Sequence, residues 1–141
     1  MAALIDTSVF VAAFWSDHPD HVASIQRCDS LSQSDGFCAA HSLAEVYSTM
    51  TRLPVKPAIP PDQAWLFVQD IVDRFTIVAL DSSEYIETIK DLVARGLGRS
   101  LIYDALIVRC ARKAAVEHIF TWDINDFRRI APDLTARIQT P

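Results

Sequence analysis

Met1-Ala-Ala-Leu-Ile-Asp-Thr-Ser8 joins a short apolar run to an acid and two hydroxyl side chains. Residues 2–5 show no alternation of polar and apolar side chains, which predicts a strand buried on both faces inside a parallel sheet. Asp6 then lies at the carboxyl end of that strand, where open α/β sheets bind their ligands. Asp is also a common helix N-cap residue, and for Asp6 taken alone the cap is the simpler interpretation.

The composition is that of a globular protein. Half of the 141 residues are hydrophobic and 22% are charged, so we expect a single domain with a real core. No stretch approaches the ~20 apolar residues that span a bilayer. Asp6 interrupts the first apolar run and Arg27 is the first basic residue, which argues against a signal peptide. We therefore expect a cytoplasmic protein with no membrane contact.

The cysteines and histidines give little support to a zinc site. Cys28, Cys38 and Cys110 are odd in number, form no C-x-x-C pair and lie in apolar surroundings, which predicts reduced thiols in the core. His18 and His21 have no second His or Cys pair at ligand spacing. We interpret these two histidines as surface residues.

The charge is unevenly distributed along the chain, whose net charge is −5. Residues 1–89 carry four basic and twelve acidic side chains, whereas residues 90–141 carry nine basic and six acidic ones. The second part is either a solvated set of helix faces or a cationic flank for a polyanion beside an acidic site.

Short apolar runs alternate with helical patterns along the whole chain. We expect strands near residues 2–5, 37–40, 75–80, 118–121 and 136–140. We expect helices near residues 8–14, 18–31, 41–53, 62–74, 81–95 and 100–115, and a short one within 122–127. This alternation predicts an α/β fold, a parallel α/β/α sandwich with right-handed crossovers.

Two acids follow predicted inner strands early in the next helical segment. Glu45 follows the second strand, but Ser42-x-x-Glu45 is also a capping-box pattern that would explain it structurally. Asp123 follows the fourth strand, and with Asp126 it is an acceptable cap and first-turn acid.

Asp104 is harder to explain structurally. It lies in the first turn of an apolar helix that should be nearly buried, and residues 107 and 108, three and four positions on, are Ile and Val. A buried carboxylate without a partner costs several kcal/mol, so we expect a specific partner.

Asp6, Glu45, Asp104 and Asp123 are all expected at the same edge of the sheet. Four converging carboxylates repel one another and raise their own pKa values unless a cation is present. Oxygen ligands alone favour Mg²⁺ or Mn²⁺ over zinc.

Four motifs carry a resemblance to a known family: Ile5-Asp-Thr-Ser8, Ser42-Leu-Ala-Glu-Val46, Tyr103-Asp-Ala-Leu106 and Thr121-Trp-Asp-Ile-Asn-Asp-Phe127. In their order, spacing and chain length the sequence resembles the PIN-domain ribonucleases, most closely the VapC-type toxins of toxin-antitoxin pairs. The resemblance runs the whole length of the chain. It implies a PIN-like three-layer α/β/α sandwich with a short central parallel sheet, formed by a single domain over residues 1–141.

The resemblance also implies an activity and its residues. It implies a Mg²⁺- or Mn²⁺-dependent endoribonuclease that leaves 5′-phosphate and 3′-hydroxyl ends, with Asp6, Glu45, Asp104 and Asp123 as its catalytic acids. Asp6 and Asp104 match the usual direct metal ligands, and the other two commonly act through metal-bound water. Ser8 matches a frequent supporting position.

The partners implied by the resemblance are an RNA substrate, a second copy of the chain in a homodimer, and a small VapB-type antitoxin that obstructs the metal site. Apolar side chains that could line such surfaces, or belong to the core, are Phe14, Trp15, Trp65 and Phe67. Arg99 and Arg112 are candidates for phosphate contacts, or lie on an exposed helix face.

Two other function classes stay open. Haloacid-dehalogenase-type phosphatases and response-regulator receivers also place an Asp after the first strand. The phosphatase needs a second Asp where this chain has Ser8, and the receiver needs an adjacent acidic pair and a late lysine, which are not found. A non-catalytic PIN-like module that binds RNA or protein is separated from an enzyme only by an activity assay.

Overall fold

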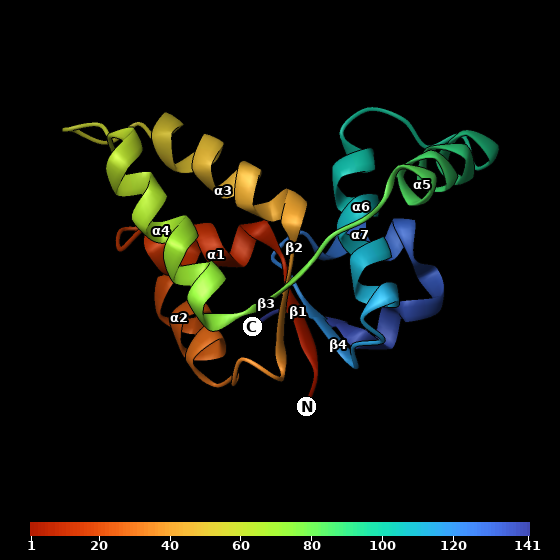
Figure 1. Ribbon diagram of the computed structural model, residues 1–141, viewed down its shortest axis with the longest axis horizontal. Coiled ribbons are helices and arrows are strands. Elements are labelled where there is room, and N and C mark those ends of the chain that lie inside the picture. The colour runs from red at the N-terminus through yellow and green to blue at the C-terminus, as the bar shows by residue number, and fades with distance from the viewer.

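A parallel five-stranded sheet forms the centre of the molecule in the computed structural model, which describes residues 1–141 (Figure 1). The strand order is β3-β2-β1-β4-β5, and every neighbouring pair is parallel. The strands are β1 (Ala3–Ile5), β2 (Gly36–Ala39), β3 (Thr76–Val78), β4 (His118–Phe120) and β5 (Ile138–Gln139). The predicted α/β fold with a short parallel sheet is confirmed.

Helices cover both faces of this sheet. In Figure 1, α1 to α4 gather on one side and α5 to α7 on the other, which gives the predicted three layers. The helices are α1 (Thr7–Phe14), α2 (His21–Asp29), α3 (Ala40–Arg52), α4 (Pro61–Arg74), α5 (Ser82–Ala94), α6 (Leu101–Lys113), α7 (Ile124–Ile130) and the 3₁₀ helix η1 (Pro132–Arg137). None of them is long and apolar enough to cross a membrane.

Strand β1 lies in the middle of the sheet and supplies both hydrophobic cores. Ala3 and Ile5 pack into the core under α1 to α4, whereas Leu4 packs into the core under α5 to α7. All three side chains are fully buried. A strand buried on both faces cannot alternate polar and apolar residues, which is why the sequence shows a continuous apolar run here.

The predictions for α6 and the cysteines are confirmed. Helix α6 buries most of its second half. Cys28, Cys38 and Cys110 are free and buried.

Other local predictions are wrong. The helix expected near residues 18–31 begins only at His21 and ends at Asp29. His18 and His21 are half-buried rather than on the surface: His18 accepts a hydrogen bond from the Asp20 backbone, and His21 Nδ1 lies 2.8 Å from the Ala12 carbonyl oxygen.

Candidate active site

The four candidate acids come from four separate parts of the chain. Asp6 directly follows β1, and Asp123 follows β4 after two residues. Glu45 lies in α3, which begins immediately after β2. Because β1, β2 and β4 are parallel, these three acids follow strands that end at the same edge of the sheet. Asp104 lies in the first turn of α6, close enough to the other three acids that their charges raise its pKa.

Asp6 is both a helix cap and a buried carboxylate. It is the N-cap of α1 and accepts a weak hydrogen bond from the Ser8 backbone N–H at 3.4 Å. Its Oδ2 also accepts short hydrogen bonds from the hydroxyls of Ser8 (2.7 Å) and Thr121 (2.8 Å). Burial raises the pKa of Asp6 to about 6, the charge of Asp123 adds to this, and the hydroxyl contacts oppose it. The cap and the functional interpretation of Asp6 are therefore compatible.

Thr121 connects Asp6 to Asp123, and the sequence reasoning assigned it no role. Its fully buried hydroxyl donates to Asp6 and accepts a 2.9 Å hydrogen bond from the Asp123 backbone N–H. Ser8 makes a second link, because its hydroxyl accepts from the Trp122 backbone N–H at 3.0 Å. The sequence signal that could have identified Thr121 is its position, directly after an inner strand and two residues before Asp123.

Glu45 does not belong to a capping box. Helix α3 begins at Ala40, so Ser42 lies inside it, and the helix has no side-chain cap. Instead Glu45 Oε1 accepts a 3.0 Å hydrogen bond from the hydroxyl of Thr7. That contact ties the acid of α3 to the residue beside Asp6, so the structural interpretation of Glu45 is wrong.

Asp104 is the most perturbed of the four acids. Burial raises its pKa most, and the charges of Asp6, Asp123, Glu45 and Asp126 add to this, to a value of about 8 in all. Its carboxylate has neither a hydrogen-bond donor nor a basic partner in the protein. The specific partner expected for Asp104 is not a side chain of this chain.

Asp123 occupies the N-cap position of α7 without capping it. Its side chain accepts no hydrogen bond from the helix, so the interpretation of Asp123 as a helix cap is wrong. Partial burial and then the charge of Asp126 raise its pKa. Asp126 therefore adds a fifth negative charge near the same edge.

The donor set fits a hard divalent cation. The four acids offer only carboxylate oxygens, and their one ion-pair contact is from His41 Nε2 to Glu45 Oε1 at 3.8 Å. No three of these side chains converge into a ready-made ligand cluster. Mg²⁺ commonly takes one or two carboxylates directly and keeps several waters, so carboxylates that stand apart can share one ion. His41 Nε2 is buried without a hydrogen-bond partner in the protein, and a hydrated ion would give it one.

The two arginines considered for phosphate contacts differ in their surroundings. Arg112 forms a bidentate pair with Asp133, with both nitrogen-to-oxygen distances 2.9 Å. Arg99 is exposed in the turn before α6, with a positive φ of 60°, and has no ion pair. Arg99 is therefore the more available of the two cations.

Sequence comparisons connect this arrangement to known proteins. A family model described as "PIN domain" matches residues 3–132. Ribonuclease VapC40 of Mycobacterium tuberculosis is 32% identical over 120 residues, which are 85% of each chain.

Solved structures share the fold at low sequence identity. The Mycobacterium tuberculosis toxin VapC20, described as cleaving the sarcin-ricin loop, superposes with a TM-score of 0.75 at 15% identity, over 92% of this chain and 95% of that one. VapBC-1 from nontypeable Haemophilus influenzae gives a TM-score of 0.67 at 16% identity, over 99% and 98% of the two chains. DNA-bound VapBC from Salmonella typhimurium gives 0.63 at 16% identity, over 100% and 97%.

Proposed function

Because the chain belongs to the PIN domain family, we propose that it is a metal-dependent endoribonuclease, the toxin of a VapBC-type toxin-antitoxin pair. Its relative of 32% identity is named a ribonuclease. The observation that carries the proposal is the group of carboxylates at the sheet edge, which has no basic partner other than the long contact from His41.

Each acid has a role in this proposal. Asp6 and Asp104 bind the metal directly, since they have the two largest pKa shifts to about 6 and about 8 and so gain most from a cation. Glu45 and Asp123 would contact the metal through its bound water. Thr121 and Ser8 hold Asp6 in place through their hydroxyls. The metal is Mg²⁺ or Mn²⁺, as the all-oxygen ligand set favours.

The reaction is hydrolysis of an RNA phosphodiester bond. When bound, a divalent ion supplies Lewis acidity and neutralises charge on the scissile phosphate. The hydroxyls of Ser8 and Thr121 fix the orientation of the Asp6 carboxylate before substrate arrives, which reduces the reorganisation needed during the reaction.

The proposed protein partners are a second copy of the chain and a VapB-type antitoxin. Four neighbours on α5 are exposed, namely Tyr85, Ile86, Ile89 and Val93, and so is Trp65 on α4. Phe14 and Phe67 are less available, because their rings stack on each other at 4.7 Å beside the core. Exposed apolar side chains of this kind are common at protein interfaces.

The experiment that tests the function is cleavage of total RNA by the purified protein. We expect cuts with Mg²⁺ or Mn²⁺, none with EDTA, and none from folded Asp6→Asn or Asp104→Asn variants. Equal cutting by these variants would indicate a contaminating nuclease. No cutting by the wild-type protein, with no metal bound, would support the non-catalytic PIN-like binding module instead.

A further inference from the structure

Two aromatic rings from different helices lie in parallel beside the candidate acids. His41 is in the first turn of α3 and Tyr103 in the first turn of α6. Their ring centroids are 5.2 Å apart and their planes differ by 5°. A centroid separation of this size between parallel rings describes an offset stack, which leaves part of each ring uncovered.

This ring pair is joined directly to the acids. His41 Nε2 lies 3.8 Å from Glu45 Oε1, one helical turn further along α3. Tyr103 immediately precedes Asp104 in α6. A group stacked on the pair would therefore lie beside the bond that these acids are proposed to act on.

Tyr103 is the open member of the pair. It is 47% exposed although its ring rests on His41, and its hydroxyl makes no hydrogen bond within the protein. The imidazole of His41 is more enclosed, with 24% of its side chain accessible. Tyr103 thus combines an accessible side chain with a ring that packs in parallel on the imidazole of His41.

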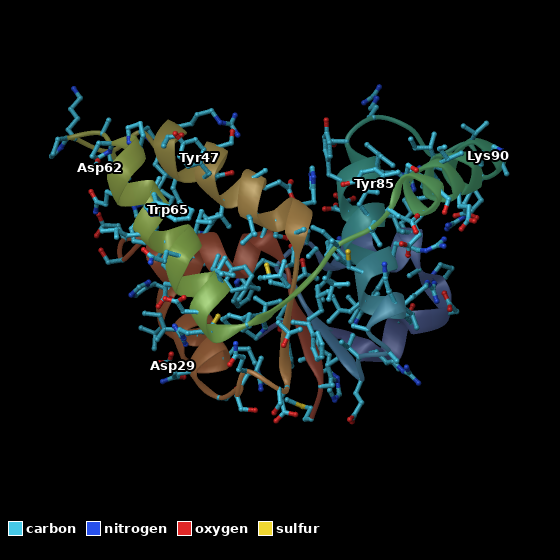
Figure 2. The ribbon with its side chains drawn as sticks, viewed as in Figure 1. Asp29, Tyr47, Asp62, Trp65, Tyr85 and Lys90 are labelled. Carbon is cyan, nitrogen blue, oxygen red and sulfur yellow. The ribbon has the colours of Figure 1, made fainter.

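Other exposed tyrosines lack this support. Tyr47 on α3 and Tyr85 on α5 are 41% and 38% exposed, and Figure 2 labels them on separate helices. Neither ring stacks on another aromatic side chain, and neither adjoins one of the four acids in sequence. Among the exposed tyrosines, Tyr103 is therefore the one whose ring stacks on a neighbouring ring beside the acids.

The charge at this edge determines what such a ring can bind. Asp104, Asp6, Asp123, Glu45 and Asp126 lie close enough for their charges to interact, and no lysine or arginine pairs with any of them. Stacking on a nucleobase does not require a cation and is tolerant of base identity. Proteins stack bases in this way only where the bases are unpaired and can leave the helix.

We propose that Tyr103, backed by His41, stacks an unpaired nucleobase next to the phosphodiester bond that is cut. This inference rests on the proposed nuclease function and adds to it a specific contact between one residue of this chain and a base beside the cut. Tyr103 contacts the base. His41 is a positioning residue that acts through Tyr103.

The test measures KM and kcat on a fluorescein-labelled RNA that spans a cut mapped in total RNA. We expect Tyr103→Leu to raise KM roughly five- to a hundredfold, the range measured for losing one base-stacking contact, and to change kcat less. Tyr103→Phe keeps the ring and should keep KM. Tyr47→Leu, at a tyrosine that is 41% exposed and stacks on no other ring, is the matched control and should also keep KM.

A modified RNA tests the same contact without changing the protein. An abasic residue on one side of the cut should raise the KM of the wild-type protein as much as Tyr103→Leu does. The same abasic RNA should remove the difference between wild type and Tyr103→Leu, because the ring then has no base to stack on.

His41 is tested by conservative rescue. His41→Phe keeps a ring under Tyr103 and should keep KM, whereas His41→Ala should raise KM by less than Tyr103→Leu does. A KM that rises equally for His41→Phe and His41→Ala would assign His41 a role through Glu45 rather than through Tyr103.

The outcomes separate this inference from the function it rests on. A wild-type protein that cuts no RNA with Mg²⁺ or Mn²⁺ overturns both. A wild-type protein that cuts RNA while Tyr103→Leu keeps its KM, or while abasic RNA is cut equally well, overturns the stacking inference alone.

Discussion

The acids on two sides of helix α6 are in opposite electrostatic states. On the outer side, towards α5 and η1, Asp133 pairs with Arg112 and Glu84 pairs with Lys113 at 2.8 Å. These contacts lower the pKa values of Asp133 and Glu84. At the sheet edge, Asp104 has no basic partner, and its pKa is raised to about 8.

The difference does not come from a shortage of cations. The helix that carries Asp104 also carries Arg109, Arg112 and Lys113, and all three pair with acids on its outer side. The basic side chains of α6 are therefore all paired away from the edge where the carboxylates gather. No lysine or arginine pairs with those carboxylates, which is the physical basis for proposing a metal site there.

The largest expected effect comes from removing a carboxylate at the sheet edge. Asp6→Asn and Asp104→Asn should each lower the RNA cleavage rate more than roughly a hundredfold, because a lost metal ligand costs more than a lost supporting contact. Asp133→Asn, the matched change on the outer side, should leave the rate unchanged. Equal losses in all three variants would contradict the distinction between the two sides.

A smaller effect is expected when the carboxylates stay and their support is removed. Thr121→Val deletes the hydroxyl that connects Asp6 to Asp123 and should lower metal affinity or cleavage by roughly 10- to 100-fold. Thr121→Ser keeps the hydroxyl and is the control. Metal titration and cleavage kinetics measure both variants, and equal behaviour of Val and Ser would show that the hydroxyl is not needed.

The unpaired state of Asp104 should also appear as a pH-dependent stability. In the unfolded chain the carboxyl loses its proton near pH 3.8, whereas in the folded protein it keeps the proton up to about pH 8. The folded state binds more protons in this window, so its stability falls as the pH rises from 3.8 to about 8. Asp104→Asn has no such titration.

Thermal melts in EDTA measure this difference. Asp104→Asn should melt a few degrees above the wild-type protein at pH 8, and its advantage should shrink towards pH 5. Mg²⁺ should then stabilise the wild-type protein and not the variant. An advantage for the variant that is the same at both pH values would show that the carboxyl of Asp104 is not perturbed.

The smallest effect is expected on the outer side. Arg112→Ala breaks the bidentate pair with Asp133, but both side chains are largely exposed, at 44% and 61%. Exposed pairs of this kind contribute less than about 1 kcal/mol to the free energy of unfolding. Denaturant titration should find this small loss, and cleavage should be unchanged unless Arg112 also contacts RNA phosphates.

The sequence could predict those features of the fold and the site that depend on short segments and their order along the chain. The apolar run before Asp6 predicted a central strand, because a strand buried on both faces has no polar positions. Parallel topology then predicted that acids following β1, β2 and β4 meet at one edge. Both predictions required only the order of short segments along the chain.

What the sequence could not predict depended on contacts between distant residues or on where a helix begins. Thr121 donates to an acid 115 positions away, and the stack of His41 on Tyr103 joins two helices. The capping-box alternative for Ser42-x-x-Glu45 stayed open in the sequence, because its exclusion depends on α3 starting directly after β2 with no intervening loop. Residues 132–137 form a 3₁₀ helix, which shows no periodic pattern in the sequence.

The most direct test of a metal site at the sheet edge is calorimetric titration of Mn²⁺ into three proteins: wild type, Asp104→Asn and Asp133→Asn. We predict that wild type and Asp133→Asn bind Mn²⁺ with the same Kd and that Asp104→Asn shows no binding at that site. If Asp104→Asn binds Mn²⁺ as the wild-type protein does, the carboxylates at the sheet edge are not the metal site, and the proposed mechanism is wrong.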